Sequence, residues 1–147
     1  MREIKFRAFG VLGERKNKWF YGSSEVEKYI NTDKRDCHLS LHGFERLIKG
    51  EFLDKKTRGE FIGMLDKNGV EIYEGDILNV YLSSVSCHTK DRIVKKVVSF
   101  ENGAFTMEWI DKNKTGFWSN FNTLSCDCTL EVIGNVYENP ELLEGAK

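Results

Sequence analysis

Apolar and polar residues alternate in short runs along most of this chain, which is the pattern of half-buried β-strands. Segments rich in glycine, asparagine and charge separate the runs, as turns do. The main runs are residues 3–9, 19–21, 61–65, 92–100, 105–109 and 130–136. No segment alternates strand and helix at the spacing of a parallel sheet. The pattern predicts a mostly β protein, built as small antiparallel, strongly bent sheets or as an SH3-like barrel, with short helical turns.

Residues 61–80 are the clearest single feature, because they indicate a strand, a tight turn, and a second strand with a further bend. The first turn contains an Asn-Gly pair, and glycine tolerates the positive φ that such a loop needs. The second bend is Tyr-Glu-Gly-Asp, and a later glycine lies inside a strand, where it marks a bulge or a close backbone approach. The residues expected to set this fold are Asn68, Gly69, Tyr73, Gly75, Asp76 and Gly134.

Helical spacing of apolar residues is confined to short segments. Residues 43–49 predict one or two helical turns, which Gly50 would end. Residues 54–59 are polar and predict a loop. A last helical turn is expected over residues 139–144, with Asn139 as its N-cap.

We expect two parts that together form one unit. Residues 1–60 would form an N-terminal β-hairpin and a mixed segment that packs on the rest. Residues 61–147 would form a β-barrel-like region. At 147 residues the chain is long enough to bury a core without disulfides or a metal.

Composition excludes some classes of function. The formal net charge is −1, so the strongly basic footprint of a duplex-binding protein is absent. No apolar run is long enough to cross a membrane, and the charged, alternating N-terminus does not resemble a signal peptide. We therefore expect a cytoplasmic protein with no membrane partner, whose four cysteines are reduced thiols.

Three segments resemble the YopX family of phage and prophage proteins: residues 1–9, residues 63–76 and residues 132–143. They occur in the family's order and spacing, at both ends and in the centre of the chain. The resemblance implies a phage or prophage origin in a bacterial host, a mostly β chain and a capacity for self-association. It brings no catalytic residues, because the shared motifs are turns, glycines and apolar strand positions.

A candidate binding patch combines cations with aromatic residues. Small β-barrels bind single-stranded nucleic acid by pairing basic grooves with stacking aromatic rings. The patch consists of Lys90, Arg92, Lys95, Lys96, Trp109 and Trp118, and a second basic region covers residues 34–58. The simpler interpretation, which we favour, is that the charges are solvated strand faces and the aromatic rings belong to the core.

Three other sets of residues contain groups that could carry chemistry. The Cys and His residues at 37, 38, 42, 87, 88, 126 and 128 include zinc-ligand types, but their spacing does not match known zinc motifs. The carboxylates Glu71, Glu74 and Asp76 fit turn chemistry better than a cation site. The end of the chain is acidic, and this asymmetry suits head-to-tail contacts or the basic surface of a partner. Its carboxylates, which oppose only Lys147, are Asp127, Glu131, Glu138, Glu141 and Glu144.

These observations favour a protein-binding or assembly module of phage origin that is not an enzyme and needs no cofactor. Its partner would be an unidentified protein or a second copy, giving an oligomer. The alternative is a β-barrel that binds single-stranded nucleic acid, whose affinity would fall steeply with salt. A third hypothesis is an enzyme or a zinc protein.

Overall fold

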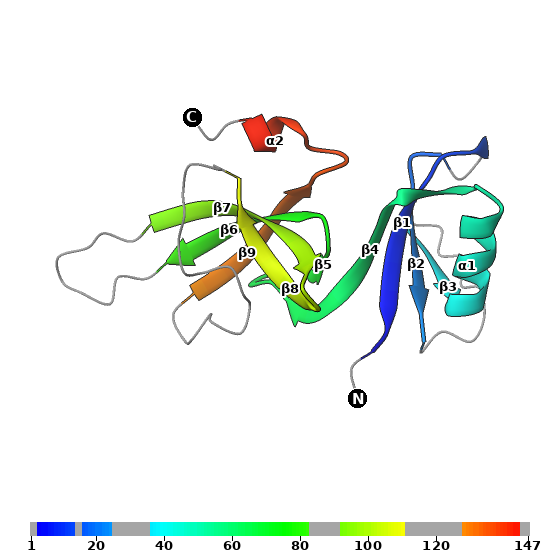
Figure 1. Ribbon diagram of the computed structural model, residues 1–147, viewed down its shortest axis with the longest axis horizontal. Coiled ribbons are helices and arrows are strands. Elements are labelled where there is room, and N and C mark those ends of the chain that lie inside the picture. The colour runs from blue at the N-terminus through cyan, green and yellow to red at the C-terminus, as the bar shows by residue number, and fades with distance from the viewer. Residues whose placement is uncertain (1–2, 14–15, 25–35, 83–91, 111–127, 145–147) are drawn as a thin grey trace. The chain divides into compact units, whose positions relative to one another are not determined.

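The computed structural model describes residues 3–13, 16–24, 36–82, 92–110 and 128–144. The protein is mostly β and consists of two compact units, Met1–Gly63 and Met64–Lys147 (Figure 1). Its described strands form a five-stranded sheet of order β3-β2-β1-β4-β5 and a four-stranded sheet of order β8-β7-β6-β9. Neither order closes on itself among these residues, so bent open sheets, and not a barrel, are the form that the fold takes.

The first unit packs one helix on a sheet (Figure 1). Its elements are β1 (Lys5–Gly10), β2 (Trp19–Ser23), β3 (Asp36–Ser40), α1 (Leu41–Lys49) and β4 (Leu53–Leu65), of which β4 continues into the second unit. Apolar side chains of α1, chiefly Phe44 and Ile48, meet Ala8, Phe20 and Leu39 of the sheet. Strands β1 and β2 form the expected antiparallel hairpin. Strands β2 and β3 pair in parallel, which corrects the expectation of purely antiparallel sheets.

Helix α1 has the predicted position and ends as predicted, with Gly50 as its C-cap, but it begins earlier. The Ser40 side chain caps it by accepting the Gly43 N–H at 3.2 Å, so the helix begins two residues before residue 43. At the other end, Phe52 N–H donates to the Leu47 carbonyl and Glu51 N–H donates to the Ile48 carbonyl. This is the Schellman arrangement, with Glu51 at the left-handed position.

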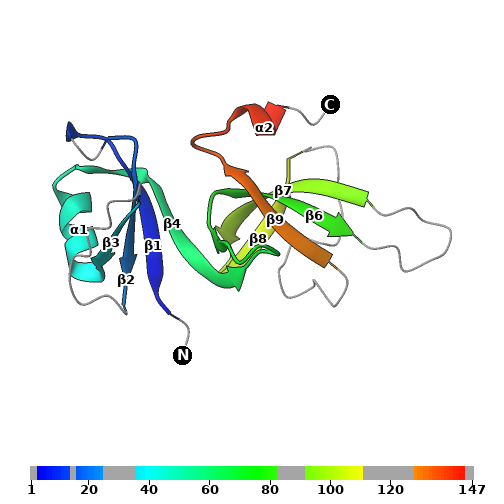
Figure 2. The ribbon, with the colours of Figure 1, turned by 180° about the vertical axis from the view of Figure 1, so that it is seen from behind.

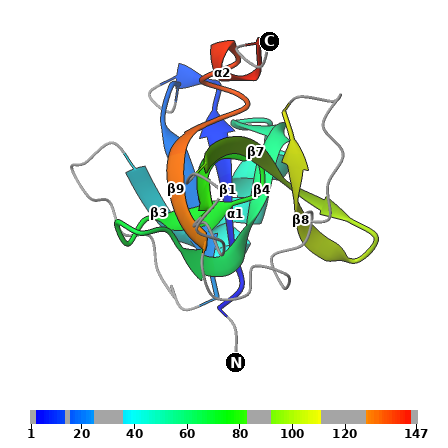
Figure 3. The same cartoon turned by 90° about the vertical axis from the view of Figure 1, so that its left-hand side faces the viewer.

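The second unit is a curved sheet with short additions (Figure 2). Its further elements are β5 (Glu71–Tyr73), β6 (Asp76–Leu82), β7 (Arg92–Glu101), β8 (Ala104–Trp109), β9 (Cys128–Asn135) and α2 (Glu141–Glu144). The strands of the four-stranded sheet are antiparallel, and β7 and β9 bend strongly (Figure 3). Leu78, Val80, Val98, Met107 and Leu130 are buried in this unit.

The glycines of the predicted fold signature have defined roles. Gly69 and Gly75 have φ values of +79° and +87°, which glycine adopts without strain. A Cβ atom at Gly75 would lie 3.0 Å from the Tyr137 ring, and one at Gly134 would lie 2.5 Å from Oδ1 of Asn139. Gly134 therefore marks a close approach of the segment that follows β9, as its place inside a strand indicated.

The acidic residues near the second bend have the predicted turn role. Asp76 is buried, and its Oδ2 accepts the Tyr73 N–H at 2.8 Å. The Tyr73 hydroxyl donates to Oε2 of Glu71 at 2.8 Å. The final helix, α2, begins at Glu141, two residues after Asn139, which was predicted as its N-cap. Oδ1 of Asn139 accepts the N–H of Asn135 at 3.3 Å.

The outer edge of β9 is covered by the turn between β4 and β5. Val132 N–H donates to Oδ2 of Asp66 at 2.9 Å, and Lys67 N–H donates to the Leu130 carbonyl at 2.9 Å. An open sheet edge otherwise offers its backbone groups to other chains. The turn predicted from Asn68 and Gly69 thus also protects this edge.

The carboxylate of Asp66 accepts three of the hydrogen bonds that hold this turn together and join it to β9. Burial of the carboxyl raises its pKa. Hydrogen bonds from three backbone N–H groups have the opposite effect and outweigh it, so that the pKa is lowered. The donors are the N–H groups of Val132, Val70 and Asn68. The carboxylate form is therefore favoured in the folded protein.

A second contact fastens the same turn to the sheet. Lys67 Nζ lies 3.2 Å from Oε1 of Glu131 and 4.4 Å from the centre of the Tyr81 ring. The Tyr81 hydroxyl also donates to Glu131. The Tyr81 hydrogen bond and then that of Lys67 lower the pKa of Glu131, while the hydrogen bond to Glu131 raises the pKa of Lys67.

Candidate binding surface

The predicted binding patch is divided between two faces of β7. Lys96 is buried, with 1% of its surface exposed, because it shares the inner face of the strand with Val98. Lys95 is exposed on the outer face. Lys96 therefore provides no exposed cation, which corrects this part of the prediction. Lys90, Trp118 and the side chain of Arg92 lie outside the described residues.

Lys96 instead forms a pair in the interior with Trp109. Its Nζ lies 4.3 Å from the centre of the Trp109 ring, directly across the β7–β8 ladder. Burial lowers the pKa of Lys96, an effect that nearby Cys128 opposes in part. Cation–π contacts of desolvated cations stabilise by about 2 kcal/mol, so this pair is a structural element.

The Cys and His residues that can be placed have separate surroundings. Cys37 is a buried thiol in the first unit, and Cys128 is a half-buried thiol in the second. The His38 ring stacks on Tyr21 with the ring centres 5.1 Å apart. Among the described residues, no three His, Cys, Asp or Glu side chains group as metal ligands do. Cys87, His88 and Cys126 lie outside these residues.

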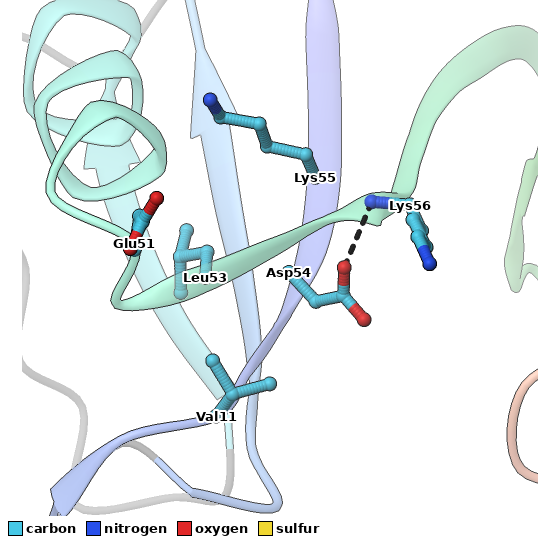
Figure 4. A pocket seen from close by; sticks show the side chains of 6 residues that line it. All are labelled: Val11, Glu51, Leu53, Asp54, Lys55 and Lys56. Carbon is cyan, nitrogen blue, oxygen red and sulfur yellow. Dashed lines mark hydrogen bonds between the residues drawn. The ribbon is translucent and has the colours of Figure 1, made fainter.

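A different surface, in the first unit, contains a hollow. It is an open hollow of about 410 Å³ at the junction of α1 and β4 (Figure 4). We call it the bulge pocket and define it by the residues that line it: Val11, Glu51, Leu53, Asp54, Lys55 and Lys56. Two aliphatic, two acidic and two basic side chains thus meet around one hollow.

A bulge in β4 creates the basic wall of this pocket. Phe9 pairs with Asp54 and Arg7 with Gly59, so residues 55–58 lie opposite Ala8 alone. Thr57 restores the missing ladder, since its Oγ1 accepts the Phe9 N–H at 2.8 Å and donates to the Asp54 carbonyl at 2.7 Å. Bulges of this kind redirect side chains beside functional sites.

The bulge also explains why the prediction of a loop at residues 54–59 is wrong. Residues 54–59 belong to β4 and are not the predicted loop. The positions that face inward here are Thr57 and Gly59, which give no apolar signal. The Lys56 N–H donates to Oδ1 of Asp54 at 2.9 Å (Figure 4), and both Lys55 and Lys56 are exposed.

Glu51 forms the opposite wall in a costly conformation. Its φ is +59°, the left-handed region, which disfavours residues with a Cβ atom. We predict that Glu51→Gly raises the free energy of unfolding by about 0.5–1 kcal/mol, since the relief of strain exceeds the entropy gained by the unfolded chain.

Chemical denaturation of Glu51→Gly checks this prediction. Lys49→Gly is the matched control, because the same substitution inside α1 should destabilise by about 1 kcal/mol. If both variants were destabilised alike, the conformation assigned to Glu51 would be wrong.

Residues in strained conformations gather at functional sites, and Glu51 lines the bulge pocket.

Exposed apolar side chains extend the surface beyond the pocket. Leu12 and Phe52 are 49% and 38% exposed, and Val11 N–H donates to the Phe52 carbonyl at 3.1 Å, which joins the two segments that carry them. Both chain segments that line the pocket thus carry an exposed apolar residue next to a lining residue, Leu12 after Val11 and Phe52 after Glu51.

The sequence does not predict this pocket. Of its lining, only the lysines belong to a feature that the sequence shows, the basic region 34–58. Glu51 and Val11 had no recognisable motif, because the pocket depends on chain segments 40 residues apart, and on a bulge that the local pattern hides.

Of the two described helices, neither is long and apolar enough to cross a lipid bilayer.

Comparison with known proteins agrees with the resemblance seen in the sequence. A family profile described as YopX protein matches residues 5–144, nearly the whole chain. A solved structure, that of protein EF1440 from Enterococcus faecalis, is 23% identical and aligns over 95% of this chain and 97% of its own, with a TM-score of 0.44. No curated protein matches. On the extent of the profile match, this chain belongs to the YopX family.

Proposed function

We propose that this protein is a binding or assembly module without enzymatic activity, which docks a partner polypeptide at the bulge pocket. The observation that carries the proposal is the mixture of groups around one open hollow. Val11 offers exposed apolar area, while Lys55 and Lys56 offer exposed cations. Such mixed surfaces recognise polypeptide segments through an apolar anchor and oriented charges.

The surroundings of the pocket favour an extended partner over a small molecule. Small-molecule sites are concave and bury most of their ligand. Here the hollow is open, and Leu12 and Phe52, which follow two of its lining residues in the chain, are exposed apolar residues. A polypeptide segment can cover the pocket and these neighbouring side chains together.

The setting that we propose is a bacterial cell that carries a phage or prophage. The family assignment supports this origin, and the buried free thiol of Cys37 is compatible with a reducing cytoplasm. Self-association, or binding of an unidentified host or phage protein, completes the proposal.

Charge reversal in the pocket tests the proposed function. We expect the double variant Lys55→Glu/Lys56→Glu to lose its captured proteins when tagged protein is purified from prophage-carrying cells treated with nuclease. The reason is that like charges across an interface cost several kcal/mol of binding free energy. Quantitative mass spectrometry of the captured proteins, compared with wild type, gives the result.

Lys95→Glu is the comparison variant, since Lys95 is also an exposed strand lysine but lies in the other unit. Retention of the partners by Lys95→Glu together with their loss from the pocket variant supports the proposal. Partners that disappear with nuclease, or that depend on Lys95 and not on the pocket, would instead indicate nucleic-acid binding and contradict it.

A further inference from the structure

We propose that the bulge pocket receives the acidic segment, residues 137–144, of a second copy of this chain. This inference rests on the proposed function and names the occupant. The segment reads Tyr-Glu-Asn-Pro-Glu-Leu-Leu-Glu, and it contains three carboxylates and no cation. It lies in the second unit, whereas the pocket lies in the first.

Charge is the first argument for this occupant. Glu138, Glu141 and Glu144 are all exposed. Lys55 and Lys56 of β4 are the exposed cations of the pocket lining, which also contains the acidic Glu51 and Asp54. The last turn of α1, which precedes Glu51 in the chain, carries two more exposed cations, Arg46 and Lys49. The carboxylates and the cations are thus complementary in sign, and complementarity of this kind steers association and sets register.

Apolar complementarity is the second argument. Leu142 and Leu143 are half-buried between the exposed carboxylates, so the segment offers aliphatic area with acidic groups on both sides. In the pocket lining, Val11 is 39% exposed beside the exposed lysines, whereas Leu53 belongs to the core and is 1% exposed. The aliphatic side chains of the segment would therefore meet Val11, with the ammonium groups of Lys55 and Lys56 beside it.

The acidic segment is also held in one shape. Oδ1 of Asn135 accepts the N–H groups of Tyr137 at 3.1 Å and Glu138 at 2.9 Å, and Asn135 Nδ2 donates to Glu138 Oε2 at 2.7 Å. The Tyr137 ring packs close to Gly75. A segment ordered before binding loses less conformational entropy on docking.

A contact between two different surfaces is heterologous. Each copy would use its acidic segment on one neighbour and its bulge pocket on another, which generates rings or chains of copies. A variant whose pocket is reversed in charge keeps a functional acidic segment, and a variant whose acidic segment is reversed keeps a functional pocket. This asymmetry allows a mixing experiment.

The experiment uses the full chain with Lys55→Glu/Lys56→Glu as the pocket variant and Glu141→Lys/Glu144→Lys as the segment variant. Sedimentation velocity of wild type over a concentration series should show association, and each variant alone should associate at least about tenfold more weakly, because like charges then meet. An equimolar mixture of the two variants should associate again. Raising salt towards 1 M, where the Debye length is about 3 Å, should weaken association of wild type.

Lys16→Glu/Lys95→Glu provides a control with the same change of net charge at exposed lysines that do not line the pocket, and it should associate as wild type does. Circular dichroism of each variant confirms that the fold is kept. If wild type and the mixture both remain monomeric, the inference is overturned. If the pocket variant has in that case still lost its captured partners from cells, the proposed function stands with another protein as occupant.

Discussion

Asp66→Ala is expected to lower the free energy of unfolding of the second unit by about 3–4 kcal/mol. The carboxylate accepts three backbone N–H groups, and hydrogen bonds to a charged acceptor contribute about 1.5–3 kcal/mol each before losses to non-additivity. Alanine would leave the Val132 N–H on the β9 edge without this acceptor. Denaturation by urea, followed by tryptophan fluorescence and circular dichroism, measures the change.

The same substitution should remove a pH dependence. Because the pKa of Asp66 is lowered in the folded protein, the unfolded chain binds the proton first as pH falls. The stabilisation is therefore present above the unfolded pKa of about 4 and is lost as pH falls below it. Unfolding of Asp66→Ala should depend less on pH between about pH 4 and pH 2 than unfolding of wild type.

Asp54→Ala is the matched control. Its Oδ1 also accepts a backbone N–H two residues later, but the described contacts of this side chain reach no other strand. We expect a loss of about 1 kcal/mol or less, as for a single surface hydrogen bond. Equal losses for Asp66→Ala and Asp54→Ala would show that Asp66 acts only within its turn and does not hold β9.

Gly22→Ala is expected to destabilise the first unit by about 3 kcal/mol. A Cβ atom at Gly22 would lie 2.6 Å from Cβ and 2.7 Å from Cγ of Phe44. Phe44 is fully buried, and its Cβ is fixed to the backbone of α1, so the whole helix would have to move away from β2. Overpacking of this kind costs about 1–3 kcal/mol and sometimes more.

Gly43→Ala gives the opposite expectation within the same pair of elements. Gly43 lies in α1, and the nearest atom to an added Cβ is Oγ of Ser40 at 3.4 Å, an ordinary contact. Alanine is favoured over glycine in a helix by about 1 kcal/mol, so this variant should be more stable than wild type. Thermal denaturation of both variants tests the packing of α1, and a Gly22→Ala protein as stable as Gly43→Ala would refute it.

Local patterns predicted the elements whose determinants are local. The 66–69 turn, the bend at Gly75 and the helix near 43–49 all depend on residues close together in sequence, and all are present. The alternation in 92–100 was also correct. The same alternation places Lys96 between Val94 and Val98 on the inner face, which agrees with its burial.

The features that the sequence patterns did not predict depend on contacts between residues far apart in the sequence. Asp66 stabilises a strand 66 positions later, and nothing near Asp66 marks that contact. The bulge of β4 follows from its pairing with β1, so residues 54–59 looked like a polar loop. Gly22 follows the predicted strand 19–21 directly, and the sequence alone does not show that Phe44 approaches too closely for a side chain at this position. The bulge pocket combines two such non-local features, which is why it was missed.

Zero-length carbodiimide crosslinking in cells tests most directly whether the bulge pocket is a docking site for polypeptide. The reagent joins an ammonium group only to a carboxylate in direct contact with it. The account predicts crosslinks from Lys55 or Lys56 to a carboxylate of another chain, identified by peptide mass spectrometry and insensitive to nuclease. Crosslinks that involve Lys95 but neither pocket lysine would contradict it.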